Sequence, residues 1–374
     1  MRAPGLKGDG DGDAPTAVRA GPGALADRLE ALPVRVEAAT VAAGESALAD
    51  YPGGLRPTST IRLVGAGEVG LGENVAFTGE AHAAFVDLAR GIERDLRAAG
   101  AGLTVGGAMS LVERAAVGER AHARAARAPA QAAIARYARA AVEAALIDLA
   151  LRQAGLGIGG LTGVAEARLR FVVSFDGGGD PVGHIGRLRA AGWGGALKLD
   201  VDPGWSGPIR RVLAAEAGLA ILDFKGRGDG ALVGDLSERF PAAIFEDPPS
   251  PEGHLRCARD APVSDVDAAA GVLARGEAIN LKAPRMGGPL AALRALELAR
   301  TSPSPAGTTR AYWGGMFEIG AGRRQARVFA ALFCPDAPND LAPHDLGRPG
   351  AAAEHDETRL IRLDGIGFGS DPDG

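Results

Sequence analysis

Four charged side chains stand where catalysis is possible, because each lies at or near the end of a short apolar segment. Asp223, Glu246 and Lys282 end such segments directly, and Asp260 lies between the last two. A parallel (β/α) barrel builds its active site from the carboxyl ends of its strands and from the loops after them. If these segments are barrel strands, their carboxylates converge and can bind a hard cation such as Mg²⁺. Lys282 then stands on the next strand as a candidate acid or base.

Composition and charge exclude several classes of protein. The chain has 374 residues, 46% hydrophobic and 23% charged, which can bury the core of one large domain and a smaller one. Its net charge of -5 provides no basic surface for nucleic acid. Cys257 and Cys334 lack the spacing of a disulfide framework or zinc site, which favours a reducing cytoplasm. No apolar run has the length of a signal-peptide core or a membrane span. We therefore expect a cytoplasmic protein without nucleic-acid or membrane partners.

The order of patterns along the chain predicts two folded parts between irregular ends. Residues 1–30 are rich in Gly, Asp, Ala and Pro, which predicts a flexible leader. Residues 31–160 combine strand-like runs with helical periodicity, which predicts an α+β domain. Residues 161–345 alternate short apolar runs with helical stretches, which predicts a parallel sheet with crossover helices. Residues 346–374 return to Gly, Asp and Pro and are predicted to be a C-terminal tail. The predicted strands of the second part are residues 171–175, 196–200, 219–223, 243–246, 278–282 and 310–313.

One glycine motif predicts a turn rather than a cofactor site. Gly65, Gly67 and Gly70 have the spacing of a dinucleotide-binding fingerprint and follow a predicted strand. That motif requires a helix to begin at the glycines. Here the chain continues as the strand-like segment Leu71 to Phe77, so we predict a β-hairpin.

Taken together with their neighbours, the charged strand ends resemble the enolase superfamily, in its muconate-lactonizing and o-succinylbenzoate synthase branch. The similar stretches follow the same order over about residues 33 to 345. They are Arg56–Ile61, Gly72-Glu73-Asn74, Ala144–Leu149, Lys198-Leu199-Asp200, Asp223-Phe224-Lys225, Glu246-Asp247-Pro248, Asn280-Leu281-Lys282 with Gly287-Gly288, and Gly314–Glu318. The resemblance implies an α/β fold in which a modified TIM (β/α) barrel follows an N-terminal α+β capping domain. The tail is then expected to return towards the capping domain.

The same resemblance implies a Mg²⁺-dependent enzyme, with Mn²⁺ as a possible substitute, that removes the α-proton of a small carboxylate-bearing substrate. The pairing of a Lys or His base with one or two Mg²⁺ ions is general to that superfamily and is not deduced from this sequence. An α-proton beside a carboxylate is weakly acidic, so the charge of the enediolate must be stabilised by a preorganised cation. By resemblance, Asp223, Glu246 and Asp260 bind the metal and Lys282 faces the substrate. A homo-oligomer is expected, as for most soluble enzymes of this size.

Two strand ends depart from the pattern of that branch. Its usual Lys-x-Lys is replaced by Lys198 and Asp200, and its Asp-x-Asn is replaced by Asp223 and Lys225. Residues two apart on a strand point to the same face, so both members of each pair are expected to face into the barrel. We therefore take Lys282, Lys198, Lys225 and Asp200 as the catalytic candidates, with two of the three lysines acting as base and electrostatic partner.

Several readings stay open on the sequence alone. Asp200 in place of the second lysine favours o-succinylbenzoate synthase-like dehydration or cycloisomerisation over amino-acid or dipeptide racemisation, which needs two acid/base groups. A barrel aldolase with a Schiff base on Lys282, or a non-catalytic relative, is an alternative of another class. The short connection over residues 247–259 leaves room for one helical turn or none. Asp265 is the alternative ligand to Asp260, although its setting is typical of a helix N-cap.

Overall fold

The computed structural model describes residues 20–48, 51, 53–100, 102–122, 129–250, 256–303, 309–343 and 358–369, without the side chains of residues 115–122 and 129–131. Residues 1–19 of the predicted leader lie outside the described residues. So do residues 344–357 and 370–374, which include most of the predicted tail.

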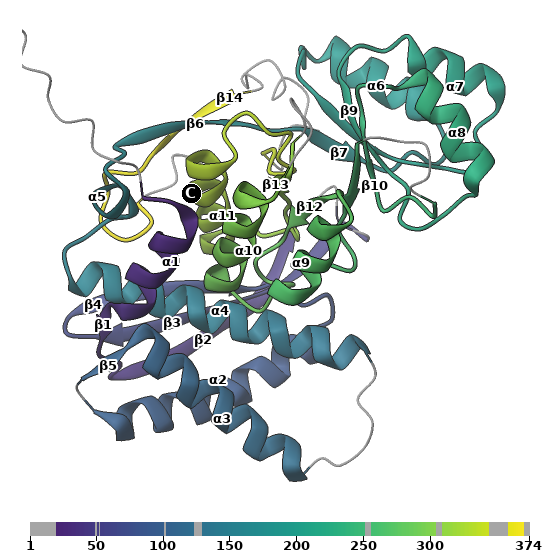
Figure 1. Ribbon diagram of the computed structural model, residues 1–374. Coiled ribbons are helices and arrows are strands. Elements are labelled where there is room, and N and C mark those ends of the chain that lie inside the picture. Colours follow the sequence, from purple (N-terminus) through teal and green to yellow (C-terminus); the bar gives the residue numbers. More distant parts are fainter. Residues whose placement is uncertain are drawn as a thin grey trace, which may run out of the picture.

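The N-terminal part is a three-stranded antiparallel sheet with long helices packed on it (Figure 1). Its sheet strands are β2 (Ala38–Ala47), β3 (Leu55–Gly65) and β4 (Glu68–Asn74). Its helices are α2 (Gly79–Ala99), α3 (Val105–His122) and α4 (Pro129–Gln153). Two short strands, β1 (Pro33–Val34) and β5 (Leu103–Thr104), pair beside them.

The predicted hairpin is confirmed, and it explains the glycines at its start. Ala66 and Gly67 have φ values of 52° and 82°, as a tight two-residue turn between β3 and β4 requires. Gly70 and Gly72 face helix α4 so closely that a Cβ there would lie 2.2 and 1.9 Å from backbone carbonyl oxygens of the helix. The glycines therefore serve the turn and the packing of α4 on β4, and no cofactor-binding helix begins at them.

The second part is a curled, seven-stranded parallel sheet with helices between its strands, so the predicted α/β barrel fold is confirmed. Its strands are β7 (Val173–Phe175), β8 (Leu197–Asp200), β9 (Leu219–Asp223), β10 (Ile244–Glu246), β11 (Cys257–Arg259), β12 (Ala278–Leu281) and β13 (Ala311–Trp313). The helices are α6 (Pro181–Ala190), α7 (Gly207–Ala214), α8 (Gly230–Arg239), α9 (Val266–Ala274), α10 (Pro289–Thr301) and α11 (Ala321–Phe333). Every predicted strand of this part coincides with an observed one within two residues. The described part of the β10–β11 connection contains no helix.

Two residues complete the ring of strands between β13 and β7. Asn339 forms a parallel bridge with Phe171, and Asp340 forms one with Gly314. The Asp340 N–H donates to Trp313 O at 2.8 Å, and the Val172 N–H donates to Asn339 O at 2.8 Å. This short segment takes the place of an eighth strand and brings the Asp340 carboxylate to the barrel interior.

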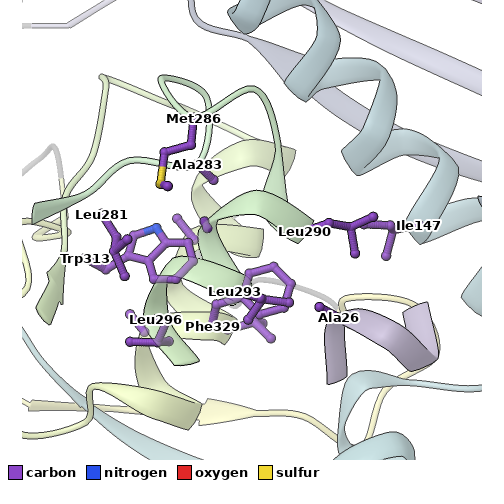
Figure 2. Close-up of a cluster of buried hydrophobic side chains, with 14 of the residues drawn as sticks. Ala26, Ile147, Leu281, Ala283, Met286, Leu290, Leu293, Leu296, Trp313 and Phe329 are labelled. Carbon is purple, nitrogen blue, oxygen red and sulfur yellow. The ribbon is translucent and has the colours of Figure 1, made fainter. Parts of the chain in front are cut away.

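The first helix corrects the predicted leader. Residues 22–30 of the predicted leader belong to helix α1 (Pro22–Ala31), which lies beside α10 and buries Leu25, Ala26 and Leu29 (Figure 1). Figure 2 shows Ala26 in the same apolar cluster as Leu293 of α10 and Phe329 of α11. Pro22 suits the first helical position, because its missing N–H has no helical partner there. The last third of the segment predicted to be a flexible leader is therefore a helix.

Two side chains of the capping domain hold it on the barrel. Glu73 of β4 accepts N–H groups of Ile319, Gly320 and Gly322 at 2.7, 2.9 and 3.1 Å, at the start of α11. Arg56 of β3 is buried and donates to carbonyl oxygens of the loop that follows β13. The capping domain is thereby fixed against the loop between β13 and α11.

The end of the chain returns along the start of the barrel. Strand β14 (Thr358–Arg362) pairs antiparallel with β6 (Glu166–Arg170), which follows the short helix α5 (Ile158–Thr162). Beyond β14, the Phe368 N–H donates to Asp148 Oδ1 of α4 at 3.2 Å. The four-part division with limits at residues 30, 160 and 345 stays a prediction apart from the correction at α1. None of the described helices is long and apolar enough to span a membrane.

Candidate active site at the carboxyl ends of the barrel strands

The carboxylates of three neighbouring barrel strands lie side by side. In the register of the parallel strands, Asp200 of β8 lies opposite Asp223 of β9, and Asp223 lies opposite Glu246 of β10. The register of β8 against β9 shifts between Leu197 and Lys198. Since a shift of one residue exchanges the two faces of a strand, this register shift decides which side chains meet at this end of the barrel.

Lys198 lies at the centre of this group. Its ammonium is 2.8 and 2.9 Å from the two carboxylate oxygens of Glu246, 3.2 Å from Asp223 Oδ2 and 3.4 Å from Asp340 Oδ2. The residue is only 2% exposed. Burial alone would lower the pKa of Lys198, but the surrounding carboxylates raise it well above its usual value. Lys198 is therefore a fixed positive charge inside the barrel.

Glu246 is surrounded by donors on both oxygens. Besides Lys198, Oε1 accepts from Asn280 Nδ2 at 3.1 Å, and Oε2 accepts from the Tyr312 hydroxyl at 2.5 Å. A carboxylate has about four lone-pair positions, and these contacts use all of them. Burial raises the pKa of Glu246 to about 7, against the opposing effect of Lys198. Burial and the nearby Glu246 raise the pKa of Tyr312 well above its usual value, which keeps its hydroxyl a donor.

Lys225 links Asp223 to Asp200 just beyond β9. The Lys225 Nζ is 2.8 Å from Asp223 Oδ2 and 3.1 Å from Asp200 Oδ1. The backbone N–H of Lys225 donates to Asp223 Oδ1 at 3.0 Å. Its φ of 48° is a left-handed conformation that costs a non-glycine residue about 1 kcal/mol or more, and such strain is concentrated at functional sites. Burial alone would lower the pKa of Lys225, but Asp223 raises it. The Lys225 side chain is half exposed and protonated.

Asp260 pairs with two cations on the far side of the group. Lys282 Nζ lies 3.0 Å from Asp260 Oδ2, and the Arg285 guanidinium contacts Oδ1. Burial alone would raise the pKa of Asp260, but Lys282 and Arg285 lower it below its usual value. Asp247 fixes the loop by accepting the N–H groups of Asp260 and Ala261 at 3.1 and 2.9 Å.

A cavity of about 460 Å³ opens beside these pairs. Its size is within the usual range for small-molecule sites. It is lined by Asp223, Lys225, Gly226, Asp247, Arg259, Asp260, Ala261, Lys282 and Arg285. Four cationic and three anionic side chains give the lining a net charge of 4 - 3 = +1, which favours an anionic ligand.

The predicted metal ligands do not fit a metal ion in this arrangement. Mg²⁺ needs oxygen ligands at about 2.0–2.1 Å in near-octahedral geometry. Glu246 has no lone-pair position left for it, and Asp223 and Asp260 each contact two cationic side chains. Among the residues that the structure describes, no group of three or more His, Cys, Asp or Glu side chains is arranged to hold a metal. The assignment of Asp223, Glu246 and Asp260 as ligands stays a prediction that this geometry does not support.

The structure brings the predicted site residues into one network, with different accessibility. Lys225 and Lys282 line the cavity, whereas Lys198 and Asp200 do not. Asp265 is the N-cap of α9, as its setting predicted, because its Oδ1 accepts the Ala268 N–H at 2.8 Å. Sequence reasoning missed four members of the site, which are Arg259, Arg285, Tyr312 and Asp340.

The signals for the missed residues differ in strength. Arg285 lies one helical turn after Lys282, so a turn after the strand could have indicated it. Tyr312 lies within a predicted strand, at a position opposite Asn280 in the parallel pairing. Asp340 had no local signal, because the segment that carries it is too short to form a recognisable apolar run.

Comparison with solved structures identifies the fold. The structure titled mandelate racemase/muconate lactonizing enzyme from Bordetella bronchiseptica RB50 has a TM-score of 0.66 and 19% identity, covering 91% of this chain and 97% of that one. A dipeptide epimerase from Enterococcus faecalis V583 has a TM-score of 0.62 and 19% identity, covering 83% and 90%. An enolase superfamily member from Listeria innocua Clip11262 has a TM-score of 0.59 and 19% identity, covering 83% and 86%.

At these identities the comparison shows a shared fold, and the o-succinylbenzoate synthase branch stays a prediction. No curated protein has a significantly similar sequence. Residues 27–160 match the N-terminal domain, and residues 165–347 the C-terminal domain, of one family described as Domain of unknown function (DUF8230). Because these two matches together span most of the 374 residues, the chain belongs to the DUF8230 family.

Proposed function

We propose that the protein is an enzyme that transfers a proton at the carbon beside the carboxylate of a small anionic substrate. The observation that carries this proposal is that two ammonium groups, those of Lys225 and Lys282, line one cavity at the barrel mouth. They come from the ends of β9 and β12, which are separated by two strands. A substrate bound between them has a proton donor or acceptor within reach on more than one side.

The substrate carboxylate is bound by the cationic part of the lining. Arg285 presents a planar guanidinium group, which suits a carboxylate because two parallel hydrogen bonds can form. Arg259 is bound to Glu277 at 2.8 Å and to Pro248 O at 2.9 Å, so it contributes positive charge to the lining rather than a free pair of donors. Negative charge that develops on the substrate oxygens during proton removal is stabilised by these fixed cations. No step of the proposal passes through Mg²⁺, since the strand-end carboxylates do not fit the ion.

The two lysines have different roles in the proposal. Lys225 is the acid, because Asp223 and Asp200 hold its proton at neutral pH. Lys282 is the base after it has released its own proton to solvent, and Arg285 also binds Asp260, so this carboxylate keeps a counter-ion while Lys282 is neutral. Proton removal by Lys282 and protonation of a leaving or attacked group by Lys225 give an o-succinylbenzoate synthase-like dehydratase or a cycloisomerase.

Racemisation or epimerisation is the second candidate. The sequence favoured one-base chemistry because Asp200 replaces the second lysine of the related branch. The Lys225 ammonium lies 3.1 Å from Asp200 Oδ1, so a neighbouring strand supplies an ammonium at that place. Two acid/base groups on separate strands are what racemisation requires.

The test is deuterium exchange. The purified protein is incubated in D₂O with hydroxy acids, N-acylamino acids and dipeptides, and uptake at the α-carbon is followed by NMR. We expect exchange with wild type and a loss of about 100-fold or more in Lys282→Ala, the usual contribution of a general base. Lys225→Ala separates the two candidates: it retains exchange but loses product formation in a dehydratase, and loses inversion at the α-carbon in a racemase.

Controls address the other classes. Borohydride trapping of a substrate on Lys282, measured by mass spectrometry, would instead establish a Schiff-base aldolase. Exchange at the wild-type rate in a folded Lys282→Ala protein would refute the assignment of the base. Absence of exchange across the whole panel would favour a non-catalytic relative.

A further inference from the structure

We propose that the ammonium of Lys198 takes the place of a divalent cation among the strand-end carboxylates, so that this barrel holds its charged centre together without a metal. The inference concerns the charge of the centre and does not depend on which reaction the neighbouring cavity performs. It departs from the Mg²⁺ dependence that the sequence resemblance implied.

The contacts of Lys198 are those of a bound cation. A lysine ammonium has three N–H donors. Here the three carboxylates of Glu246, Asp223 and Asp340 lie within 3.4 Å of Nζ; the first two lie at strand ends, and Asp340 lies in the segment that closes the barrel. The Lys198 side chain is only 3% exposed, so its ammonium is shielded from solvent. One lysine thus connects β8, β9, β10 and the segment that closes the barrel.

Glu246 cannot serve a second cation at the same time. Glu246 accepts two hydrogen bonds from Lys198, one from Asn280 and one from Tyr312. A metal ion could gain an oxygen of Glu246 only by displacing one of these buried donors. Displacement would leave that donor without a partner in the barrel interior, which is unfavourable.

The charges around Lys198 also argue against a bound metal ion. Lys198, Lys225, Lys282 and Arg285 are each paired with one or more carboxylates of the group. Those carboxylates are Asp200, Asp223, Glu246, Asp260 and Asp340, which gives a net charge of 4 - 5 = -1. The carboxylates are therefore nearly neutralised by side chains of the chain itself. A dication entering the group would lie among four positive charges.

Local backbone structure fixes Lys198 in this position. The register shift between Leu197 and Lys198 sets how Lys198 and Asp200 meet β9. Asp340 reaches the ammonium only because Asn339 and Asp340 close the barrel between β13 and β7. Both features belong to the backbone and not to a flexible side chain, so the ammonium is preorganised at the centre.

The inference is tested by metal-dependent stability. Wild type is treated with a chelator, and its thermal unfolding is compared with and without millimolar Mg²⁺ or Mn²⁺. A cation that binds only the folded state must raise the melting temperature. We expect no shift for wild type. We expect Lys198→Met to melt at a lower temperature and to recover part of that loss with Mg²⁺ or Mn²⁺, because its carboxylates have lost their ammonium.

Matched variants make the result specific. Lys225→Met also removes an ammonium from Asp223, but it leaves Glu246 saturated, so we expect it to gain no metal dependence. In Lys198→Met, adding Asp223→Asn should abolish the recovery by Mg²⁺.

A direct binding measurement keeps the inference testable if Lys198→Met does not fold. Calorimetric titration of chelated wild type with Mn²⁺ should show no stoichiometric binding. Stoichiometric binding that Asp223→Asn removes would overturn the inference. That outcome is independent of the deuterium exchange experiment, which tests the proposed function by itself.

Discussion

Glu143 makes the stability of the protein depend on pH in a direction that can be worked out. Glu143 lies on α4 and is buried, with Oε1 accepting the Leu290 N–H at 2.8 Å and Oε2 3.1 Å from Arg139. Burial raises its pKa from 4.5 to about 7, against the lowering effects of Arg139, Leu290 and the more distant Arg294. Glu113 of α3 adds a small raising effect. The protein therefore binds the proton of Glu143 more tightly when folded than when unfolded.

The sign and size of the Glu143 contribution to the free energy of unfolding follow from the difference between its folded and unfolded pKa values. Because the folded pKa is the higher one, the stabilisation is complete below about pH 4.5 and is lost as the pH rises through about 7. The shift from 4.5 to about 7 corresponds to about 3 kcal/mol in the free energy of unfolding. Glutamine keeps an acceptor for the Leu290 N–H and does not ionise. We thus expect the stability of Glu143→Gln relative to wild type to increase by about 2.5 kcal/mol between pH 5 and pH 8.

The assay is chemical unfolding of wild type and Glu143→Gln at several pH values between 5 and 8. At each pH, the free energy of unfolding of wild type is subtracted from that of Glu143→Gln. The change of this difference with pH reports on Glu143, because other groups titrate equally in both proteins. A difference in unfolding free energy that stays constant over this range would refute the reasoning. A difference that grows towards acid pH would show that Arg139 outweighs burial.

Three further predictions concern the elements that position the site. Glu73→Ala leaves N–H groups at the start of α11 without their acceptor and should lower the free energy of unfolding by about 3 kcal/mol, with a smaller loss for Glu73→Gln, as measured by urea unfolding. Gly314→Ala places a Cβ 2.3 Å from Asn280 Oδ1 and 2.7 Å from Lys282 Cε, so it must displace the Lys282 side chain. We expect the rate of deuterium exchange to fall about 10-fold or more. An unchanged rate would contradict the assigned position of Lys282. Leu29→Ala, in the helix that replaces the predicted leader, should cost about 2–5 kcal/mol in a thermal or urea melt, whereas a loss below 1 kcal/mol would mean that α1 does not belong to the core.

Most of the barrel could be predicted from the sequence because its strands are buried apolar runs with clear ends. The run that ends at Asp223 coincides with β9 residue for residue, and the predicted hairpin after Gly65 is present. Strand β11 (Cys257–Arg259) was only inferred from the position of Asp260, since its sequence has no apolar run. Helix α1 was missed because its glycines and proline, read locally, indicate a loop, and its apolar stripe is stabilised only by packing on α10.

The sequence by itself determined which charged residues lie at the carboxyl ends of the strands, because strand ends follow from the limits of apolar runs. It also predicted that Lys198 and Asp200 share one face of their strand, because side chains alternate; Lys225 lies beyond the end of β9, where alternation no longer applies. Only the tertiary structure decided what fills the space between the carboxylates. Asp340 joins the group through a two-residue closing segment, and a register shift between β8 and β9 positions Lys198. Whether an ammonium or a metal ion balances buried carboxylates depends on distances between separate strands, and these distances are fixed only when the barrel closes.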